Sequence, residues 1–332
     1  MGEATEEEKI GVLLLNLGGP DSLHAIKPFL YNLFSDREII KLGPPFFQKP
    51  LALIISILRS NKTKRIYRLI GGKSPIFDIT LAQADALEKA LNSSLVIPHL
   101  SFFFKVYVGM RYWHPFIGEV VPEIKKNGVK KLIAISMYPQ FSSATTGSSL
   151  TELKKIISHY PIEVFSITSW FNHPLYVEAL VDGIKRGIES FESELNIHVI
   201  FSAHNLPESL IKEGDPYVKQ IKETIKEITK RLNINWSLAF QSKTGPVKWL
   251  KPTTETMLET LARGGYKNIL IVPISFVSDH IETLYEIDIL YKNRANKLGL
   301  VLKRVDSLNT HPLFIGALKD IVLNGLREKG WI

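Results

Sequence analysis

The chain of 332 residues contains no cysteine. This absence excludes disulfide bonds, thiolate zinc sites, cysteine nucleophiles and iron–sulfur clusters held by cysteine. Any transition-metal chemistry must therefore use histidine, carboxylate or methionine ligands. Long apolar runs are missing as well, since none approaches the roughly 20 residues that a membrane-spanning helix needs. We therefore expect a protein that is soluble or attached to a membrane surface.

We expect no targeting leader, because the first ten residues, MGEATEEEKI, are acidic and lead directly into an apolar run. They resemble neither a secretory signal nor an Arg-rich transit peptide. The formal net charge is +8, which suits an anionic substrate, an anionic lipid surface, a nucleic acid or simply a solvated basic surface. No nucleic-acid-binding motif is recognisable, so we do not expect a nucleic-acid partner.

Short β-rich apolar runs alternate with longer amphipathic stretches, which is typical of parallel α/β sheets. The expected strands are Ile10–Leu17, Lys105–Gly109, Lys131–Ser136, Ile162–Ile167, Ile197–Ser202, Trp236–Gln241, Ile269–Ile274 and Leu300–Val305. The expected helices are Leu81–Asn92, Ile117–Asn127, Gly147–Tyr160, Pro174–Glu192, Tyr217–Leu232, Thr253–Gly264 and Pro312–Lys329. Two groups of four strands predict two Rossmann-like domains, each with a four-stranded parallel sheet flanked by helices. We expect residues 1–168 with a closing helix at 311–332 to form the first domain, and residues 169–310 the second.

One stretch, Gly43–Arg68, interrupts this alternation. An apolar patch is followed there by the basic residues Arg59, Lys62, Lys64, Arg65 and Arg68. Composition alone favours a core helix with a basic solvent face over a segment that lies on a membrane surface.

Four polar segments follow predicted strands, where ligands bind in doubly wound sheets. The segment Asn16–Asp21 is glycine-rich but lacks dinucleotide spacing, so a tight turn is the simpler interpretation. The hydroxyl-rich segment Ser136–Gly147 could bind an anion or cap a helix.

The other two segments contain candidate catalytic residues. His204 follows the strand at Ile197–Ser202, within Phe201–Pro207. Farther along, Glu282 and Glu286 are four residues apart, with Asp279 and His280 just before them. Like charges at this spacing raise each other's pKa, which favours proton transfer or cation binding. The spacing differs from the HExxH pattern of zinc proteases. The residues alone therefore indicate cation or proton chemistry at the mouth of the second sheet.

In this order, the segments resemble the ferrochelatase family from about Val12 to Asp306. The segments that carry the resemblance are GMRYWHP (Gly109–Pro115), YPQFSSATTGSS (Tyr138–Ser149), SAHNLP (Ser202–Pro207), GDPY (Gly214–Tyr217), QSKTGP (Gln241–Pro246) and SDHIETLYEID (Ser278–Asp288). The match is nearer to the branch that uses protoporphyrin than to the branch that uses coproporphyrin. It implies an enzyme that inserts Fe²⁺ into protoporphyrin IX, releases two protons and completes haem biosynthesis. The porphyrin would lie in a cleft between the two domains.

The resemblance also implies roles for individual residues. The implied catalytic residues are His204, Glu282, Glu286, Arg111 and Tyr112, with Arg111 and Tyr112 opposite the histidine. His204 and Glu282 would also be the metal ligands. The implied porphyrin contacts are Arg59, Lys62 and Ser74 at the propionates, Leu17, Tyr138, Trp249 and Phe276 at the walls, and Asp279 and His280 at the floor. The chain departs from the family pattern at Leu290, where a third acid is expected after Glu286.

The basic stretch gains a different interpretation from the resemblance, because it corresponds to a lip that dips into the membrane and admits porphyrin. The resemblance thus implies a cytoplasmic protein bound peripherally to the inner membrane of a bacterium, with an anionic membrane surface as partner. The preceding haem-pathway oxidase is a further candidate partner. We expect no tightly bound cofactor, with Fe²⁺ as substrate and no [2Fe–2S] cluster, because the chain has no cysteine.

Two alternatives remain open. A chelatase for another metal or tetrapyrrole would share the fold, and a porphyrin- or haem-binding carrier would share the cleft. Repeated turnover, as opposed to stoichiometric binding, distinguishes an enzyme from a carrier.

Overall fold

The computed structural model describes residues 8–93, 102–192, 196–243 and 247–332. The strands run over β1 Glu8–Asn16, β2 Phe102–Met110, β3 Lys131–Ser136, β4 Glu163–Ile167, β5 Ile197–His204, β6 Asn235–Gln241, β7 Asn268–Pro273 and β8 Val301–Arg304. The α-helices are α1 Ile26–Ser35, α2 Gln48–Leu69, α3 Ile76–Asn92, α4 Ile117–Lys126, α5 Ser148–Ile157, α6 Pro174–Glu189, α7 Glu208–Lys212, α8 Tyr217–Thr229, α9 Thr254–Arg263, α10 Lys292–Lys297 and α11 Pro312–Glu328. A 3₁₀ turn, η1, covers Pro45–Phe47, and two π-helical segments cover η2 Ser143–Gly147 and η3 Glu282–Tyr291.

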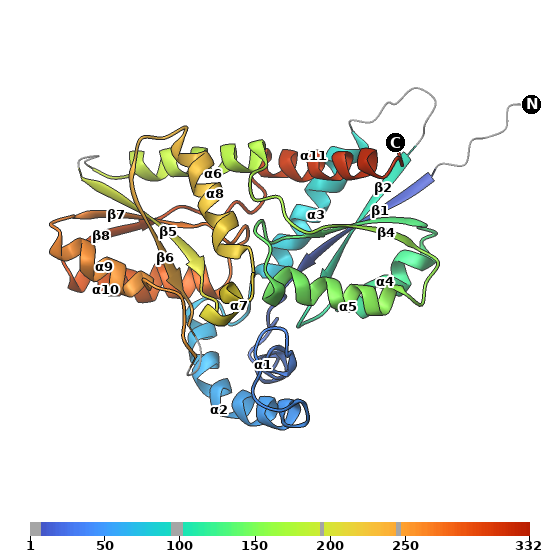
Figure 1. Ribbon diagram of the computed structural model, residues 1–332, viewed down its shortest axis with the longest axis horizontal. Coiled ribbons are helices and arrows are strands. Elements are labelled where there is room, and N and C mark those ends of the chain that lie inside the picture. The colour runs from blue at the N-terminus through green and yellow to red at the C-terminus, as the bar shows by residue number, and fades with distance from the viewer. Residues whose placement is uncertain (1–7, 94–101, 193–195, 244–246) are drawn as a thin grey trace, which may run out of the picture.

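The strands form two parallel sheets of four, in the orders β2-β1-β3-β4 and β6-β5-β7-β8. The central strands are apolar and almost fully buried because helices cover both faces of each sheet (Figure 1). In the first sheet α4 and α5 cover one face and α3 and α11 the other. The predicted fold class, with its two four-stranded parallel sheets, is confirmed. In both sheets the strand order reverses beside the first strand of the set, between β1 and β3 and between β5 and β7.

A single hydrophobic core joins the two halves of the molecule. It contains buried side chains from both sheets, such as Val12 of β1 and Val199 of β5. Helix α11 lies in line with α6 across the top of the molecule and also packs against α3 (Figure 1). Its Phe314 lies with its ring centroid 5.8 Å from that of Trp170, in the link between the halves. The sequence assigned this helix to the first domain, whereas it contacts helices of both halves. The domain boundaries near residue 168 stay a prediction.

Helices α1 and α2 project below the two sheets as a hairpin (Figure 1). We call residues 36–69, which follow α1 and include α2, the lip. Gln48 closes its base, because the Gln48 side chain is buried and donates to the carbonyl oxygens of Phe34 (2.8 Å) and Ile40 (2.9 Å). Helix α1 was not predicted from the sequence, although its buried positions Ile26, Phe29, Leu30 and Phe34 have helical spacing.

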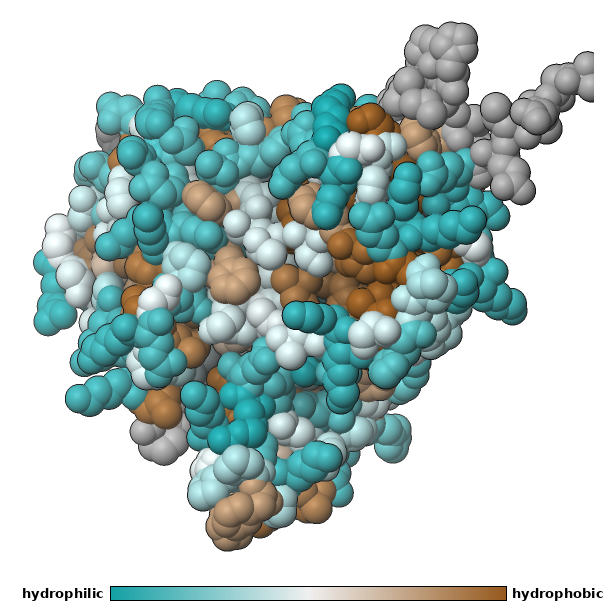
Figure 2. Space-filling view, turned by 45° about the vertical axis from the view of Figure 1, so that its right-hand side comes forward, coloured by the Kyte–Doolittle hydropathy of each residue, from teal (hydrophilic) through white to brown (hydrophobic). Residues whose placement is uncertain are grey.

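Helix α2 is not the core helix that its composition suggested. It turns small side chains such as Ala52 and Ser56 inward. Several large apolar residues of the lip are exposed instead: Phe46, Phe47, Leu53, Ile54, Ile57 and Leu58. Figure 2 shows apolar side chains at the tip of this projection. No helix in the described part of the chain is both long enough and apolar enough to cross a bilayer.

Candidate active site

A cavity of about 480 Å³ lies at the carboxyl ends of the central strands. Residues that follow or end four strands line it: Leu17 after β1, Tyr138 after β3, His204 at the end of β5 and Phe276 after β7. These four strands flank the places where the strand order reverses in each sheet, which is where doubly wound sheets bind ligands. The volume falls in the usual range for small-molecule sites. The two sheets therefore open onto one shared cavity.

His204 is held in place from several sides. Its backbone N–H donates to Ser275 Oγ (2.9 Å), and the hydroxyl of Tyr217 donates to its carbonyl oxygen (3.1 Å). Its Nδ1 lies 2.9 Å from Glu282 Oε2. An ionised carboxylate only accepts hydrogen bonds, so Nδ1 carries the proton and Nε2 is the free acceptor of the neutral ring.

The electrostatics of the His204–Glu282 pair favour a charged imidazole. Burial alone would lower the pKa of His204, but the charge of Glu282 and the hydrogen bond to it raise the pKa above its usual value. Burial acts to raise the pKa of Glu282, yet the charge of His204 and the same hydrogen bond lower it. The pair therefore gains stability as imidazolium and carboxylate, which makes His204 a stronger base than a free histidine.

Glu286 has the opposite character. Burial and the nearby charge of Glu282 raise the pKa of Glu286 to about 7. The two acids were expected to raise each other's pKa from one side of a helix. They lie on one helix, which is a π-helix, but only the pKa of Glu286 is raised, because His204 lowers that of Glu282. One carboxylate stays ionised while its neighbour takes up a proton near neutrality. This arrangement suits the passage of protons away from His204.

Two residues that the sequence analysis gave no role connect these acids. Ser242 Oγ donates to Glu282 Oε2 (2.7 Å) and also bonds Glu286 Oε2. Gln241 Nε2 donates to the carbonyl oxygen of Glu282 (3.0 Å) and to Glu286 Oε2 (3.2 Å). Ser242 has φ of +69°, a conformation that costs free energy for a non-glycine residue. Their signal in the sequence was their position at the carboxyl end of β6, the neighbour of β5, because Gln241 ends this strand and Ser242 follows it. The rest of that motif, residues 244–246, lies outside the described residues.

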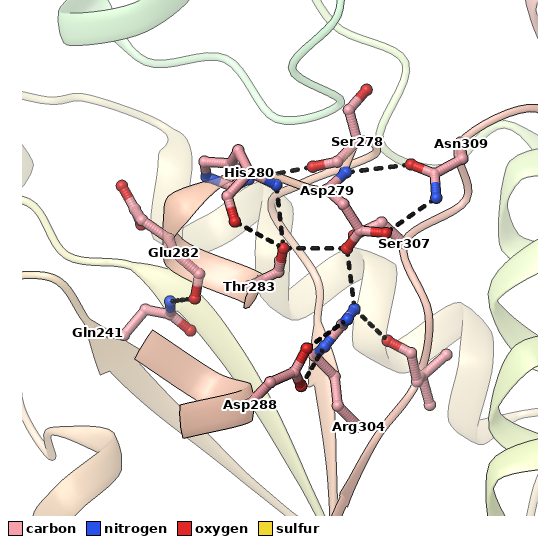
Figure 3. Close-up of polar contacts among 11 residues, drawn as sticks. Gln241, Ser278, Asp279, His280, Glu282, Thr283, Asp288, Arg304, Ser307 and Asn309 are labelled. Carbon is pink, nitrogen blue, oxygen red and sulfur yellow. Dashed lines mark hydrogen bonds and ion pairs between the residues drawn. The ribbon is translucent and has the colours of Figure 1, made fainter. Parts of the chain in front are cut away.

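Asp279 and His280, expected together at the cavity floor, have separate surroundings. His280 lines the cavity, and its Nδ1 donates to the carbonyl oxygen of Ser278 (3.0 Å). Burial lowers the pKa of His280, which keeps the ring neutral. Asp279 is not part of the lining, so its expected contact with the porphyrin stays a prediction. Its carboxylate binds Arg304, Asn309, Ser307 and Thr283 instead (Figure 3).

Arg111 and Tyr112, expected opposite His204, also lie outside the cavity lining. Asp36, just after α1, accepts at its Oδ2 from Arg111 Nη2 (2.9 Å), from Tyr112 Oη (2.6 Å) and from Ser148 Oγ (2.5 Å). These bonds turn Arg111 and Tyr112 toward the base of the lip. Burial acts to raise the pKa of Asp36, but the bonds from Ser148 and Tyr112 and the charge of Arg111 lower it. Asp36 was missed because nothing in the local sequence pairs it with β2.

The remaining predicted porphyrin contacts divide into two groups. The residues that line the cavity as expected are Leu17, Tyr138, Trp249, Phe276 and Arg59, the last with its guanidinium 5.3 Å from the ring centroid of Phe34. Lys62 is exposed on α2 and is not part of the lining. Ser74 is buried and lines a second, smaller cavity. Its backbone N–H donates to the carbonyl oxygen of Pro20 (2.8 Å). The expected contacts of Lys62 and Ser74 with the porphyrin propionates stay predictions, since neither residue lines the main cavity.

Leu290 is 39 % exposed and offers no third acid beyond Glu286. Within the described part of the chain, no group of three or more His, Asp or Glu side chains is placed to hold a metal ion. His204 and Glu282 would thus offer an incoming cation one imidazole nitrogen and one carboxylate, and other ligands would come from elsewhere.

Comparison with known proteins gives a consistent result. The family model described as Ferrochelatase matches residues 9–326. A protein named Ferrochelatase from Geotalea uraniireducens is 50% identical over 319 residues, which cover 95% of this chain and 97% of the relative. Another of that name, from Gloeothece citriformis, is 48% identical over 331 residues, covering 97% of this chain and 84% of the relative.

Among solved structures, SirB from Bacillus subtilis with Fe³⁺ is similar in fold, with a TM-score of 0.54 and 10% identity, covering 96% of this chain and 95% of that chain. The sirohydrochlorin chelatase SirB from Bacillus subtilis subspecies spizizenii in complex with cobalt has a TM-score of 0.51 and 11% identity, covering 96% and 94%. At such identities the likeness supports the fold alone.

Proposed function

The chain belongs to the ferrochelatase family, and we propose that the porphyrin into which it inserts Fe²⁺ is protoporphyrin IX, held in the cavity beside His204. It is an enzyme, a metal chelatase of haem biosynthesis. The observation that carries the assignment of the site is the His204–Glu282 pair, 2.9 Å apart, in the wall of a cavity shared by both sheets.

The side chains that line the cavity suit a porphyrin, which has carboxylates on one edge and an apolar macrocycle. Three basic residues of the lip, Arg37, Lys41 and Arg59, line the cavity. Arg and Lys form charge-assisted bonds with carboxylates, so these cations can bind the propionates of a porphyrin. The apolar and aromatic walls, including Leu17, Tyr138 and Phe276, suit the vinyl and methyl edge of a planar macrocycle.

His204 is proposed to accept the pyrrole protons that Fe²⁺ displaces. Insertion exchanges two N–H protons for one cation, so a base must lie beside the ring. Nε2 of neutral His204 can take a proton, and Glu282 then stabilises the imidazolium through its 2.9 Å bond to Nδ1. Glu286, bridged to Glu282 by Ser242, can receive the proton next. The same imidazole and carboxylate could bind the incoming Fe²⁺ before insertion.

Walls that grip a flat ring unevenly would also bend it and expose its nitrogen lone pairs. Tyr138, Trp249 and Phe276 line the cavity and could supply such contacts.

The lip is proposed to lie on an anionic membrane. Phe46 is 72% exposed and Leu58 is 74% exposed, whereas monomeric proteins in water usually expose few contiguous apolar side chains. Basic residues of α2, among them Lys62 and Arg65, are exposed near this apolar surface, and lysine and arginine are attracted to anionic headgroups. We further propose that the protein acts at the cytoplasmic face of a bacterial inner membrane and takes its porphyrin from the preceding oxidase of the pathway.

One experiment tests the proposed function directly. Purified protein is mixed without oxygen with Fe²⁺ and either protoporphyrin IX or coproporphyrin III, and the change from free porphyrin to haem is followed by absorbance over many equivalents. Repeated turnover with a preference for protoporphyrin is expected. Stoichiometric binding without turnover would instead indicate a carrier, and a preference for coproporphyrin would overturn the choice of substrate.

A further inference from the structure

Glu282 and Glu286 lie on an unusual helix. Segment η3 is a π-helix of ten residues, whereas π-helical geometry normally occurs as single turns within α-helices, frequently at functional sites. No side chain caps its N-terminus. A helix this uncommon needs contacts from outside its own backbone to keep its two acids in place.

Arg304, the last residue of β8, makes these contacts. Its side chain is 8% exposed. Nε and Nη2 donate to the two carboxylate oxygens of Asp288, each at 2.8 Å, and Nη1 donates to Asp279 Oδ1 at 3.0 Å. Asp279 lies three residues before η3 and Asp288 lies within it. One planar guanidinium thus binds Asp279, which precedes the helix, and Asp288, which lies within it.

Asp279 is itself held by further bonds. Its carboxylate accepts from Thr283 Oγ1 (3.0 Å), Ser307 Oγ (2.9 Å) and Asn309 Nδ2 (2.9 Å). Burial acts to raise the pKa of Asp279, but the charge of Arg304 and these bonds lower it, so the carboxylate is ionised at neutral pH. Figure 3 shows Asp279, Thr283 and Arg304 on one side of the start of η3, with the side chain of Glu282 pointing away from them.

We propose that Arg304 is a positioning residue for the insertion reaction: by binding Asp279 and Asp288 it sets the directions of Glu282 and Glu286 toward His204 and Ser242. A π-helix turns through a smaller angle per residue than an α-helix. If η3 relaxed toward α-helical geometry, Asp288 would rotate about the helix axis relative to Glu282, and the two-pronged bond to Arg304 would break. This inference rests on the proposed function of His204 and Glu282, and it assigns a role to a network that does not touch the cavity.

The test uses Asp288→Asn in the full-length protein. The Asp288 side chain is 36% exposed, against 16% for Asp279, so its loss of charge threatens folding least. We expect kcat for Fe²⁺ insertion to fall by about tenfold to a hundredfold while KM for porphyrin stays unchanged, since misplaced catalytic groups act on the chemical step. Arg304→Lys keeps the positive charge but cannot form the paired hydrogen bonds of the guanidinium, so it should have the same effect. Arg294→Lys is the matched control, because Arg294 pairs with Glu259 at the surface and should leave kcat unchanged.

A double-mutant cycle separates positioning from general destabilisation. If Asp288 acts through the acids of η3, Asp288→Asn should reduce kcat less in a Glu286→Gln background than in the wild type. Equal reductions in both backgrounds, or wild-type kcat in Asp288→Asn and Arg304→Lys, would overturn the inference. A His204→Ala variant measured in parallel keeps the two proposals distinct. Its wild-type turnover would refute the assignment of the catalytic pair, whereas its inactivity beside a fully active Asp288→Asn would refute the positioning role alone.

Discussion

His204 at the end of β5 and Glu282 at the start of η3 are 78 residues apart in the chain, and their side chains meet at 2.9 Å. The sheet brings them together because β5 and β7 are neighbours and η3 follows β7. The hydrogen bond orients the imidazole, and the carboxylate stabilises its protonated form. One contact therefore sets both the direction and the strength of the base.

The first prediction concerns that base. His204→Ala should lower kcat by about 10² to 10⁴, the usual contribution of a positioned general base, and should leave porphyrin affinity largely intact. Porphyrin binding is measured by fluorescence quenching and kcat by haem absorbance. A variant that kept its rate would show that another group takes the pyrrole protons.

The pH dependence of kcat tests the partner carboxylate. Only neutral His204 can accept a proton, so the rate should rise with pH through the pKa of His204, which Glu282 raises above its usual value. Glu282→Gln removes that charge, and the rising limb should move to lower pH while the maximum rate falls. Ser209→Ala is a suitable control, because Ser209 lines the cavity at another place. A limb at the same pH in Glu282→Gln would contradict the coupling.

Glu286 should make stability depend on pH. Its pKa is raised to about 7 in the folded protein, so it contributes stability that is present below its unfolded pKa and is lost as pH rises through about 7. The free energy of unfolding of Glu286→Gln minus that of the wild type should therefore be about 2 kcal/mol larger at pH 8 than at pH 5. Urea denaturation of both proteins at pH 5 and pH 8 measures this change. The same difference between variant and wild type at both pH values would contradict the prediction.

Asp36 should stabilise the base of the lip. Asp36→Ala removes the acceptor of Arg111, Tyr112 and Ser148. We expect it to cost about 2 kcal/mol in free energy of unfolding, because a largely buried guanidinium loses its nearer carboxylate and keeps only Glu152 at 3.9 Å. The pKa of Asp36 is lowered, so this contribution is present above its unfolded pKa and is lost as pH falls through the folded value. The control Asp78→Ala breaks an exposed pair with Lys73 and should cost less than about 1 kcal/mol. Similar costs in both variants would show that the Asp36 cluster contributes little.

Membrane binding should depend on the tip of the lip. Leu58→Glu should weaken binding to vesicles that contain anionic lipid by about tenfold or more, because it removes apolar burial and adds a repelled charge. Trp236→Glu is the control, since Trp236 is an exposed apolar residue in the second half of the chain. Vesicle sedimentation measures both. Equal binding of Leu58→Glu and the wild type would place the membrane contact elsewhere.

The strands could be predicted from the sequence because their signals are local, and the family resemblance pointed to His204 and Glu282 as the proposed catalytic pair. Each strand is a short apolar run, and His204 and Glu282 each follow such a run in a recognisable motif. The partners of Asp36 could not be predicted, because that cluster joins α1, β2 and α5, three elements whose relative positions depend on the whole fold. The same holds for Asp279, whose sequence motif suggested a place in the cavity while Arg304 and Asn309 hold it outside.

Helix α2 illustrates a different limit. Its apolar residues are equally consistent with a buried and an exposed helix, since the sequence does not show whether an apolar side chain packs in the core or lies at the surface. The orientation follows from small residues such as Ala52 and Ser56, which let α2 pack closely on α1 and turn Leu58 outward.

The hydrophobic cluster that both sheets share also divides the molecule by its expected tolerance to substitution. Substitutions in that core or beside His204 disturb packing that both halves depend on. The lip contacts the rest of the chain through Asp36 at its base and through the packing of α2 on α1. The exposed residues farther out on the lip lie apart from that core, so substituting them should leave the His204–Glu282 pair in place.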